Sequence, residues 1–189
     1  VEYATHISSA SNALVKITDA ILDLASIDAG VLELKPEQTD PREIMELAAS
    51  AVRPRLEKHD VMLVLDTDVA PESCVADPLR LRQVFENVLD NAADFAPDGS
   101  TVAFSCTAQD GGLTFTVTDE GPGLSIEDVD QLFERFHTEQ SGRQRGAGLG
   151  LALVKSLIDL HGGSVSINNR DGGGTEVAIA LPRVPKNLS

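Results

Sequence analysis

Apolar residues recur along the first 28 residues at alternating spacings of four and three. The positions are Tyr3, Ile7, Ala10, Leu14, Ile17, Ile21 and Leu24. This heptad repeat predicts one long helix over residues 3–28 with an apolar seam. A single helix cannot bury such a seam on itself, so we expect a bundle completed by another segment or another subunit. The alternative is a helix that lies on the domain that follows.

Two further helices are predicted where an aspartate precedes a proline. Asp40-Pro41 and Asp77-Pro78 each place a capping carboxylate before a proline at the first helical position. The second of these helices runs to about Phe95. The predicted apolar faces are Ile44, Leu47, Ala48, Ala51 and Leu56 in the first helix, and Leu81, Val84, Phe85, Val88, Leu89 and Ala92 in the second. Between the two helices, residues 61–65 are apolar throughout and predict a buried strand.

The second half of the chain predicts two hairpins separated by a helix. Strands are expected at residues 101–107 and 113–118, and again at residues 164–168 and 176–181, with Gly-rich turns between them. Helices and mostly antiparallel hairpins in separate runs indicate an α+β fold, a two-layer sandwich with helices on one face of a sheet. We divide the chain into residues 1–34, which carry the long helix, and residues 35–189.

The charge balance restricts the partners. Fifteen basic against 30 acidic residues give a net charge of −15, which excludes nucleic acid and an anionic membrane surface as bulk partners. Cys74 and Cys106 have neither metal-ligand nor disulfide-framework spacing, and we interpret them as core thiols of a protein in a reducing compartment. The sequence shows no apolar run long enough to span a membrane and no signal peptide, so we expect a soluble, cytoplasmic domain.

A glycine run introduces the candidate chemistry. Gly146, Gly148 and Gly150 alternate with other residues and lead directly into a helix that continues to Leu160. Unobstructed N–H groups at a helix N-terminus favour an anion such as phosphate. The Lys-Ser/Thr pair of a P-loop is missing. By itself, the run could equally be a turn before a helix.

Two other places carry polar groups with suitable chemistry. Asn87 and Asn91 lie four apart on one helix face, where an amide oxygen could bind Mg²⁺, although a solvated polar face is the simpler interpretation. Asp119 directly follows a strand and precedes Gly121 and Gly123. Its carboxylate could accept a hydrogen bond from an exocyclic amine such as that of adenine, or it could be a turn aspartate.

These features, together with Phe133 and Phe136, stand in the order and spacing of the N, G1, F and G2 boxes. Over about residues 35–183 the chain strongly resembles the catalytic ATP-binding domain of bacterial sensor histidine kinases, in the gyrase/Hsp90/MutL-like superfamily with its Bergerat-type ATP-binding fold. Residues 1–34 resemble the second helix of the dimerisation and histidine-phosphotransfer hairpin.

The resemblance implies roles around the nucleotide base and metal. Asn91 corresponds to the Mg²⁺ ligand, and Asn87 to its partner near the phosphates. Phe95 is placed like the aromatic that lies against adenine. Asp119 corresponds to the residue that bonds the adenine amino group. Gly121 and Gly123 correspond to the residues that shape the wall beside adenine. Thr175 corresponds to the residue that supports Asp119 through water.

The resemblance also implies an ATP lid. Arg143 and Arg145 lie where a basic residue approaches the phosphates, and Arg143 is a candidate catalytic residue with Asn87. Gly146, Gly148 and Gly150 with Leu149 correspond to the hinge of the lid and the phosphate-facing helix start. The expected reaction is phosphoryl transfer from ATP to a histidine, for which positioning and charge neutralisation suffice.

Two further features bear on that reaction. Related hydrolases place a glutamate base where this chain has Asn87, which cannot take a proton, so transfer is favoured over hydrolysis. The acceptor motif of the phosphotransfer hairpin is absent, and His6 is interpreted as a surface histidine. We therefore expect the acceptor, and the first hairpin helix, upstream of this sequence.

Asp94 departs from the family pattern, which usually has lysine there. Reversing a charge about 5 Å from a phosphate, at an effective dielectric of about 20, changes the interaction by about 3 kcal/mol. This suggests weak or vestigial ATP use, as in divergent DivL-like members that bind partners.

Three functions follow. The first is the ATP-binding half of a histidine kinase that phosphorylates an upstream histidine and, through it, a response regulator. The second is a scaffold that binds a response regulator or another histidine kinase with little catalysis. The third, a gyrase-like or chaperone-like ATPase, is disfavoured by Asn87. In the first two, a homodimer is expected through the helical hairpin.

Overall fold

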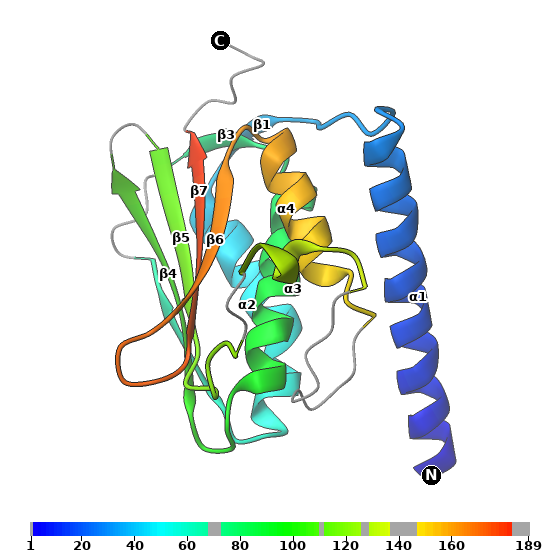
Figure 1. Ribbon diagram of the computed structural model, residues 1–189, viewed down its shortest axis with the longest axis vertical. Coiled ribbons are helices and arrows are strands. Elements are labelled where there is room, and N and C mark those ends of the chain that lie inside the picture. Colours follow the sequence, from blue (N-terminus) through cyan, green and yellow to red (C-terminus); the bar gives the residue numbers. More distant parts are fainter. Residues whose placement is uncertain (1, 68–72, 110–111, 126–128, 137–146, 183–189) are drawn as a thin grey trace.

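The computed structural model describes residues 2–67, 73–109, 112–125, 129–136 and 147–182. A long helix, α1 (Glu2–Asp28), stands beside a two-layer unit in which helices cover one face of a β-sheet (Figure 1). The α+β sandwich predicted from the sequence is therefore confirmed. None of the helices in these ranges is long and apolar enough to cross a membrane.

The main sheet has five strands in the order β2-β4-β5-β7-β6. Their bounds are β2 (Met62–Asp66), β4 (Thr101–Gln109), β5 (Gly112–Thr118), β6 (Ser164–Asn169) and β7 (Thr175–Pro182). Both predicted hairpins form, and β5 pairs with β7 to join them. Strands β2 and β4 run parallel, and the other three neighbouring pairs in this sheet are antiparallel. The strand predicted at residues 61–65 forms as β2, but the expectation that it is buried is wrong, because β2 is an edge strand and Met62 remains 59% exposed.

Three helices pack on one face of this sheet: α2 (Pro41–Glu57), α3 (Pro78–Phe95) and α4 (Gly150–Leu160). The predicted caps are present. The Asp40 carboxylate accepts from the Arg42 N–H at 2.8 Å, and Asp77 accepts from the Arg80 N–H at 3.1 Å. These bonds satisfy N–H groups that a helix start otherwise leaves unpaired. The second cap fixes where α3 begins and hence which of its residues face the sheet.

The core lies between the helices and the sheet. Phe85 of α3 packs against Phe104 and Phe115, with ring centroids 5.1 and 4.7 Å apart. All six residues predicted on the apolar face of α3 are buried. On α2 the prediction was partly wrong, because Leu47 and Ala51 are exposed. The buried residues of α2 are Pro41, Ile44, Met45, Ala48, Ala49, Val52 and Leu56.

Three short elements were not predicted. Strands β1 (Glu37–Thr39) and β3 (Cys74–Ala76) pair antiparallel in a separate two-stranded sheet, and η1 (Val129–Phe133) is a 3-10 helix. Strands of three residues are too short to show a period, so hydrophobic patterning could not reveal them. The predicted core thiols are confirmed, since Cys74 and Cys106 are free and buried.

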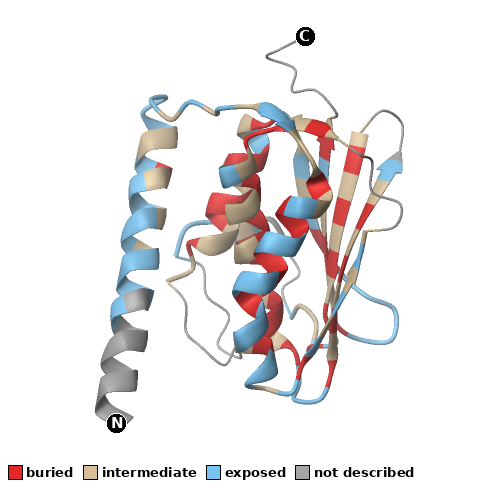
Figure 2. Ribbon diagram, turned by 180° about the vertical axis from the view of Figure 1, so that it is seen from behind, coloured by how far each residue is buried: buried red, intermediate tan, exposed pale blue. Residues whose placement is uncertain are grey.

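Helix α1 forms as predicted and contacts the domain along one side. Leu24 is buried, whereas Leu14 and Ile21 of the same predicted seam are 65% and 46% exposed. Figure 2 shows the exposed outer side of this helix. Ion pairs join α1 to the domain: Asp23 with Arg80 at 2.8 Å, Lys16 with Asp90 at 2.8 Å and Asp28 with Arg135 at 2.6 Å. Helix α1 therefore lies on the domain, as the alternative interpretation had it, while part of its seam remains uncovered.

Candidate nucleotide site

A cavity of about 580 Å³ opens between α1, α2, α3, the start of α4 and strands β5, β6 and β7. This volume is within the usual range for small-molecule sites. The predicted site residues that line it are Asn87, Asn91, Asp94, Phe95, Asp119, Gly123, Gly148, Leu149, Gly150 and Thr175. Arg143, Arg145 and Gly146 lie outside the described residues. Segments separated by almost ninety positions thus meet at one site.

One end of the cavity is built around Asp119. This residue is only 6% exposed, and its carboxylate accepts from the Gly121 N–H at 2.7 Å. The Asp119 N–H donates to the Thr175 carbonyl at 3.0 Å, and the Arg170 guanidinium donates to the Asp119 carbonyl at 2.8 Å. Burial raises the pKa of the Asp119 carboxyl, and the hydrogen bond from the Gly121 N–H opposes that shift. The result is a fixed acceptor at the end of strand β5.

Close backbone approaches explain two glycines near Asp119. A Cβ on Gly121 would lie 2.8 Å from the Asp119 carboxylate and 3.0 Å from the Phe95 carbonyl oxygen. Gly174 has φ +89, and a Cβ there would lie 2.0 Å from the Asp119 carbonyl oxygen. Side chains at these positions would displace the wall that carries the acceptor. Gly121 does not itself line the cavity but supports its wall.

The other end combines α3 with the first turn of α4. Asn87 and Asn91 project from successive turns of α3 into the cavity. The Asn87 amide nitrogen donates to the Gln83 carbonyl at 2.8 Å, and its oxygen faces Gly150, where a Cβ would lie 3.1 Å away. Helix α4 begins at Gly150 after Leu149, whose side chain caps no N–H group. The N-terminus of α4 therefore lies at the cavity beside two amide side chains, an arrangement suited to an anion.

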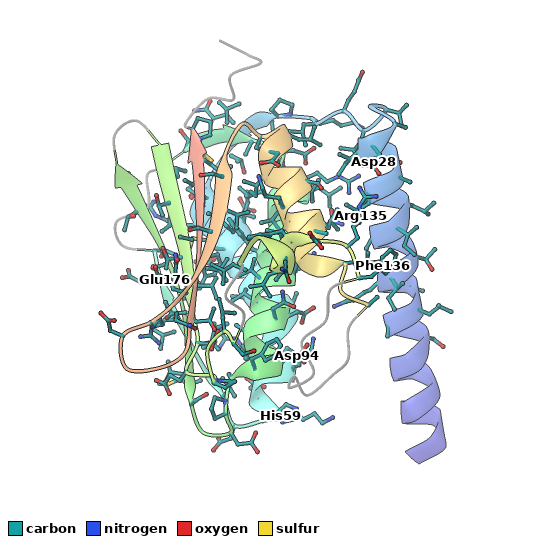
Figure 3. The ribbon with its side chains drawn as sticks, in the orientation of Figure 1. Asp28, His59, Asp94, Arg135, Phe136 and Glu176 are labelled. Carbon is teal, nitrogen blue, oxygen red and sulfur yellow. The ribbon has the colours of Figure 1, made fainter. Side chains whose placement is uncertain are left out.

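The F-box aromatics are placed differently from each other. Phe133 packs against the core, whereas Phe136 is 68% exposed and lies near α1 in Figure 3. The Phe136 N–H donates to the Gly148 carbonyl at 2.9 Å. Leu132, which sequence reasoning did not single out, is buried and lines the cavity. The segment therefore supports the glycine run through its backbone.

The structure gives Asp94 a partner that the sequence did not predict. Its carboxylate pairs with the Arg55 guanidinium of α2, which also bonds Asp90 at 2.9 Å. Asp94 thus does not present an uncompensated negative charge to the cavity, because Arg55 offsets it. Sequence reasoning missed Arg55 since 39 positions separate it from Asp94 and no local pattern joins them. Figure 3 shows Asp94 on α3, at the end of the helix near His59.

Comparisons with known proteins agree with this geometry. Residues 76–185 match the family described as histidine kinase-, DNA gyrase B- and HSP90-like ATPases. The chain is 35% identical over 185 residues to the histidine protein kinase DivJ of Caulobacter vibrioides. That match covers 96% of this chain but only 31% of DivJ, so the chain spans about a third of that relative's length.

Two solved structures are also similar. Full-length ShkA in complex with AMPPNP superimposes with a TM-score of 0.83 and 28% identity, covering 96% of this chain and 38% of ShkA. The histidine kinase ThkA in complex with the response regulator protein TrrA has a TM-score of 0.76 over 96% of this chain and 51% of that one. At 20% identity, the second match supports the fold alone. With its match over residues 76–185, which line the cavity together with α1 and α2, the chain belongs to the family of histidine kinase-, DNA gyrase B- and HSP90-like ATPases.

Proposed function

We propose that this chain binds ATP with Mg²⁺ and is the catalytic domain of a two-component sensor histidine kinase. The observation that carries the proposal is the meeting of four separate segments at one cavity: the two asparagines of α3, Asp119, the start of α4 and Thr175. Each supplies a group suited to a different part of the nucleotide. Relatives named as histidine kinases support the same function.

In this proposal the nucleotide lies along α3. The Asp119 carboxylate accepts from the adenine amino group, with Phe95 beside the base. The first amides of α4 and Asn87 contact the phosphates. The Asn91 amide oxygen fits a Mg²⁺ ligand, because this ion prefers oxygen ligands and retains several waters. The ion would neutralise charge on the phosphates. Arg143 and Arg145 are proposed as further phosphate contacts.

Transfer rather than hydrolysis is proposed as the reaction. Asn87 offers no basic oxygen to take a proton from water, whereas phosphoryl transfer to a histidine imidazole needs mainly positioning. The acceptor histidine lies outside residues 1–189, and a response regulator receives the group next. The uncovered apolar residues of α1, such as Leu14 and Ile21, support a homodimer through a helical hairpin. Free thiols at Cys74 and Cys106 are in keeping with a cytoplasmic domain.

The alternative of a scaffold with weak or no ATP use is not favoured. It depended on Asp94 repelling the phosphates, and Arg55 offsets that charge. DivJ, a relative with 35% identity, is named as a histidine protein kinase.

Calorimetric titration tests the proposal. The wild-type chain is expected to bind Mg-ATP, and Asn91→Ala is expected to lose the part of the affinity that depends on Mg²⁺ while retaining adenosine binding. Asn168→Ala, at an exposed position of β6, is the matched control and should bind as the wild type does. Binding of neither adenosine nor Mg-ATP by the folded wild type would rule the function out. Phosphate release that is steady and independent of any acceptor protein would favour hydrolysis instead.

A further inference from the structure

Four charged side chains from three helices meet at one wall of the cavity. Lys16 comes from α1, Arg55 from α2, and Asp90 and Asp94 from α3, and all four line the cavity. Asp90 accepts from Lys16 at 2.8 Å and from Arg55 at 2.9 Å, while Arg55 also pairs with Asp94. The two cations and two anions of this cluster sum to zero charge.

The cavity must nevertheless accommodate a polyanion. The chain carries a net charge of −15, and two of the carboxylates of α3 stand at the wall. Among the cavity-lining residues in the described ranges, Lys16 and Arg55 are the cations. Besides a bound Mg²⁺ ion and the first amides of α4, Lys16 and Arg55 are therefore the positive groups of the described cavity lining that a triphosphate could contact.

Arg55 is the better fixed of the two. Its side chain is 27% exposed and held by two carboxylates, which are themselves 22% and 15% exposed. The Lys16 side chain is 70% exposed and bonds Asp90, and such exposed ion pairs contribute little to stability. A planar guanidinium carries several N–H donors in a rigid fork that matches phosphate geometry. The two carboxylates thus hold a guanidinium that lines the cavity in a fixed position.

We propose that Arg55 contacts the phosphate groups of the bound nucleotide, and that Asp90 and Asp94 are positioning residues that hold its guanidinium at the cavity wall. This inference rests on the proposed function, since it requires a nucleotide in the cavity. It gives α2, which contributes no other predicted site residue, a direct part in binding. It also makes Asp94 part of a functional ion pair.

A contact between Arg55 and the phosphates changes the Mg-ATP affinity expected of the variant Asp94→Lys. If Asp94 merely repelled the phosphates, Asp94→Lys would improve Mg-ATP binding. With Arg55 as the phosphate contact, a lysine at position 94 repels the guanidinium and displaces it from the wall. We therefore expect Asp94→Lys to bind Mg-ATP no better than the wild type.

The first experiment compares Mg-ATP with adenosine as probes, by calorimetry on the full 189-residue chain. Hydrogen bonds to charged groups have strengths that correspond to an affinity loss of about ten- to a hundred-fold when removed. Arg55→Met should weaken Mg-ATP binding by that factor and leave adenosine binding unchanged. Arg53→Met, at an exposed position of the same helix, is the matched control and should change neither. Arg55→Lys should recover part of the affinity, because it keeps the charge without the fork.

A double variant distinguishes direct contact between Arg55 and the phosphates from mere neutralisation of the Asp94 charge by Arg55. If Arg55 only cancelled the charge of Asp94, removing both charges in Arg55→Met with Asp94→Asn would restore wild-type affinity for Mg-ATP. If Arg55 contacts the phosphates, the double variant stays about as weak as Arg55→Met. Restoration in the double variant overturns the proposal, as does unchanged Mg-ATP affinity in Arg55→Met. Failure of the wild type to bind either probe would instead count against the proposed function itself.

Discussion

Replacing Asp119 by asparagine tests the base-recognition end of the cavity with little change in shape. The asparagine oxygen can still accept from the Gly121 N–H, which lies 2.7 Å from the native carboxylate. The substitution removes the negative charge and adds an amide N–H₂ group. That group would face the adenine amino group. Two hydrogen-bond donors would then face each other, whereas the native carboxylate offers an acceptor to the amino group.

The expected magnitude follows from the strength of the lost bond. A hydrogen bond to a charged acceptor contributes about 1.5–3 kcal/mol, so Mg-ATP affinity should fall about ten- to a hundred-fold. Stability should change in the other direction. Burial raises the pKa of Asp119 above its ordinary value, so its contribution to stability is full at low pH and is lost as pH rises through the folded-state pKa. At neutral pH the buried charge is unfavourable, and asparagine relieves it.

Two measurements on the same sample check this reasoning. Calorimetry gives the Mg-ATP affinity, and thermal unfolding without nucleotide gives the melting temperature, which should stay the same or rise. Asp171→Asn, in the exposed turn between β6 and β7, is the charge-matched control. A variant that binds Mg-ATP as the wild type does would refute the assignment of Asp119 to the base. A lower melting temperature would refute the inference about its buried charge.

Two further predictions concern stability. Gly174→Ala should lower the free energy of unfolding by about 2 kcal/mol or more, because its Cβ would lie 2.0 Å from the Asp119 carbonyl oxygen. Urea titrations measure this loss. Gly172→Ala, at a glycine with open space around it, is the control and should lower the free energy of unfolding by less. Burial lowers the pKa of His161, which is 1% exposed, so the unfolded chain binds more protons and stability should decline as pH falls below about 6.5. Urea unfolding between pH 8 and pH 5 should show this decline in the free energy of unfolding. His161→Gln should remove the part of the decline that His161 causes. An unchanged pH dependence in the variant would contradict the assignment of that part to His161.

Local patterns revealed helix α3 almost completely. The Asp77 cap, the apolar period and the two asparagines all lie within one short segment, so spacing alone places Asn87 and Asn91 on one face. Burial on α2 and β2 was less predictable. Leu47 and Met62 are exposed because no helix or strand in the described part of the chain covers their side of the element, and that depends on segments far along the chain.

The sequence by itself determined the α-helices, both hairpins, the α+β class and the order of the site residues along the chain. These follow from short-range properties: side-chain period, capping and turn residues act within a few positions. Only the tertiary structure decided which residues meet. It placed Arg55 against Asp94 across 39 positions and thereby gave that aspartate a compensating charge. The physical reason is that the electrostatic effect of a charged side chain depends on its neighbours in space, which the local pattern does not contain.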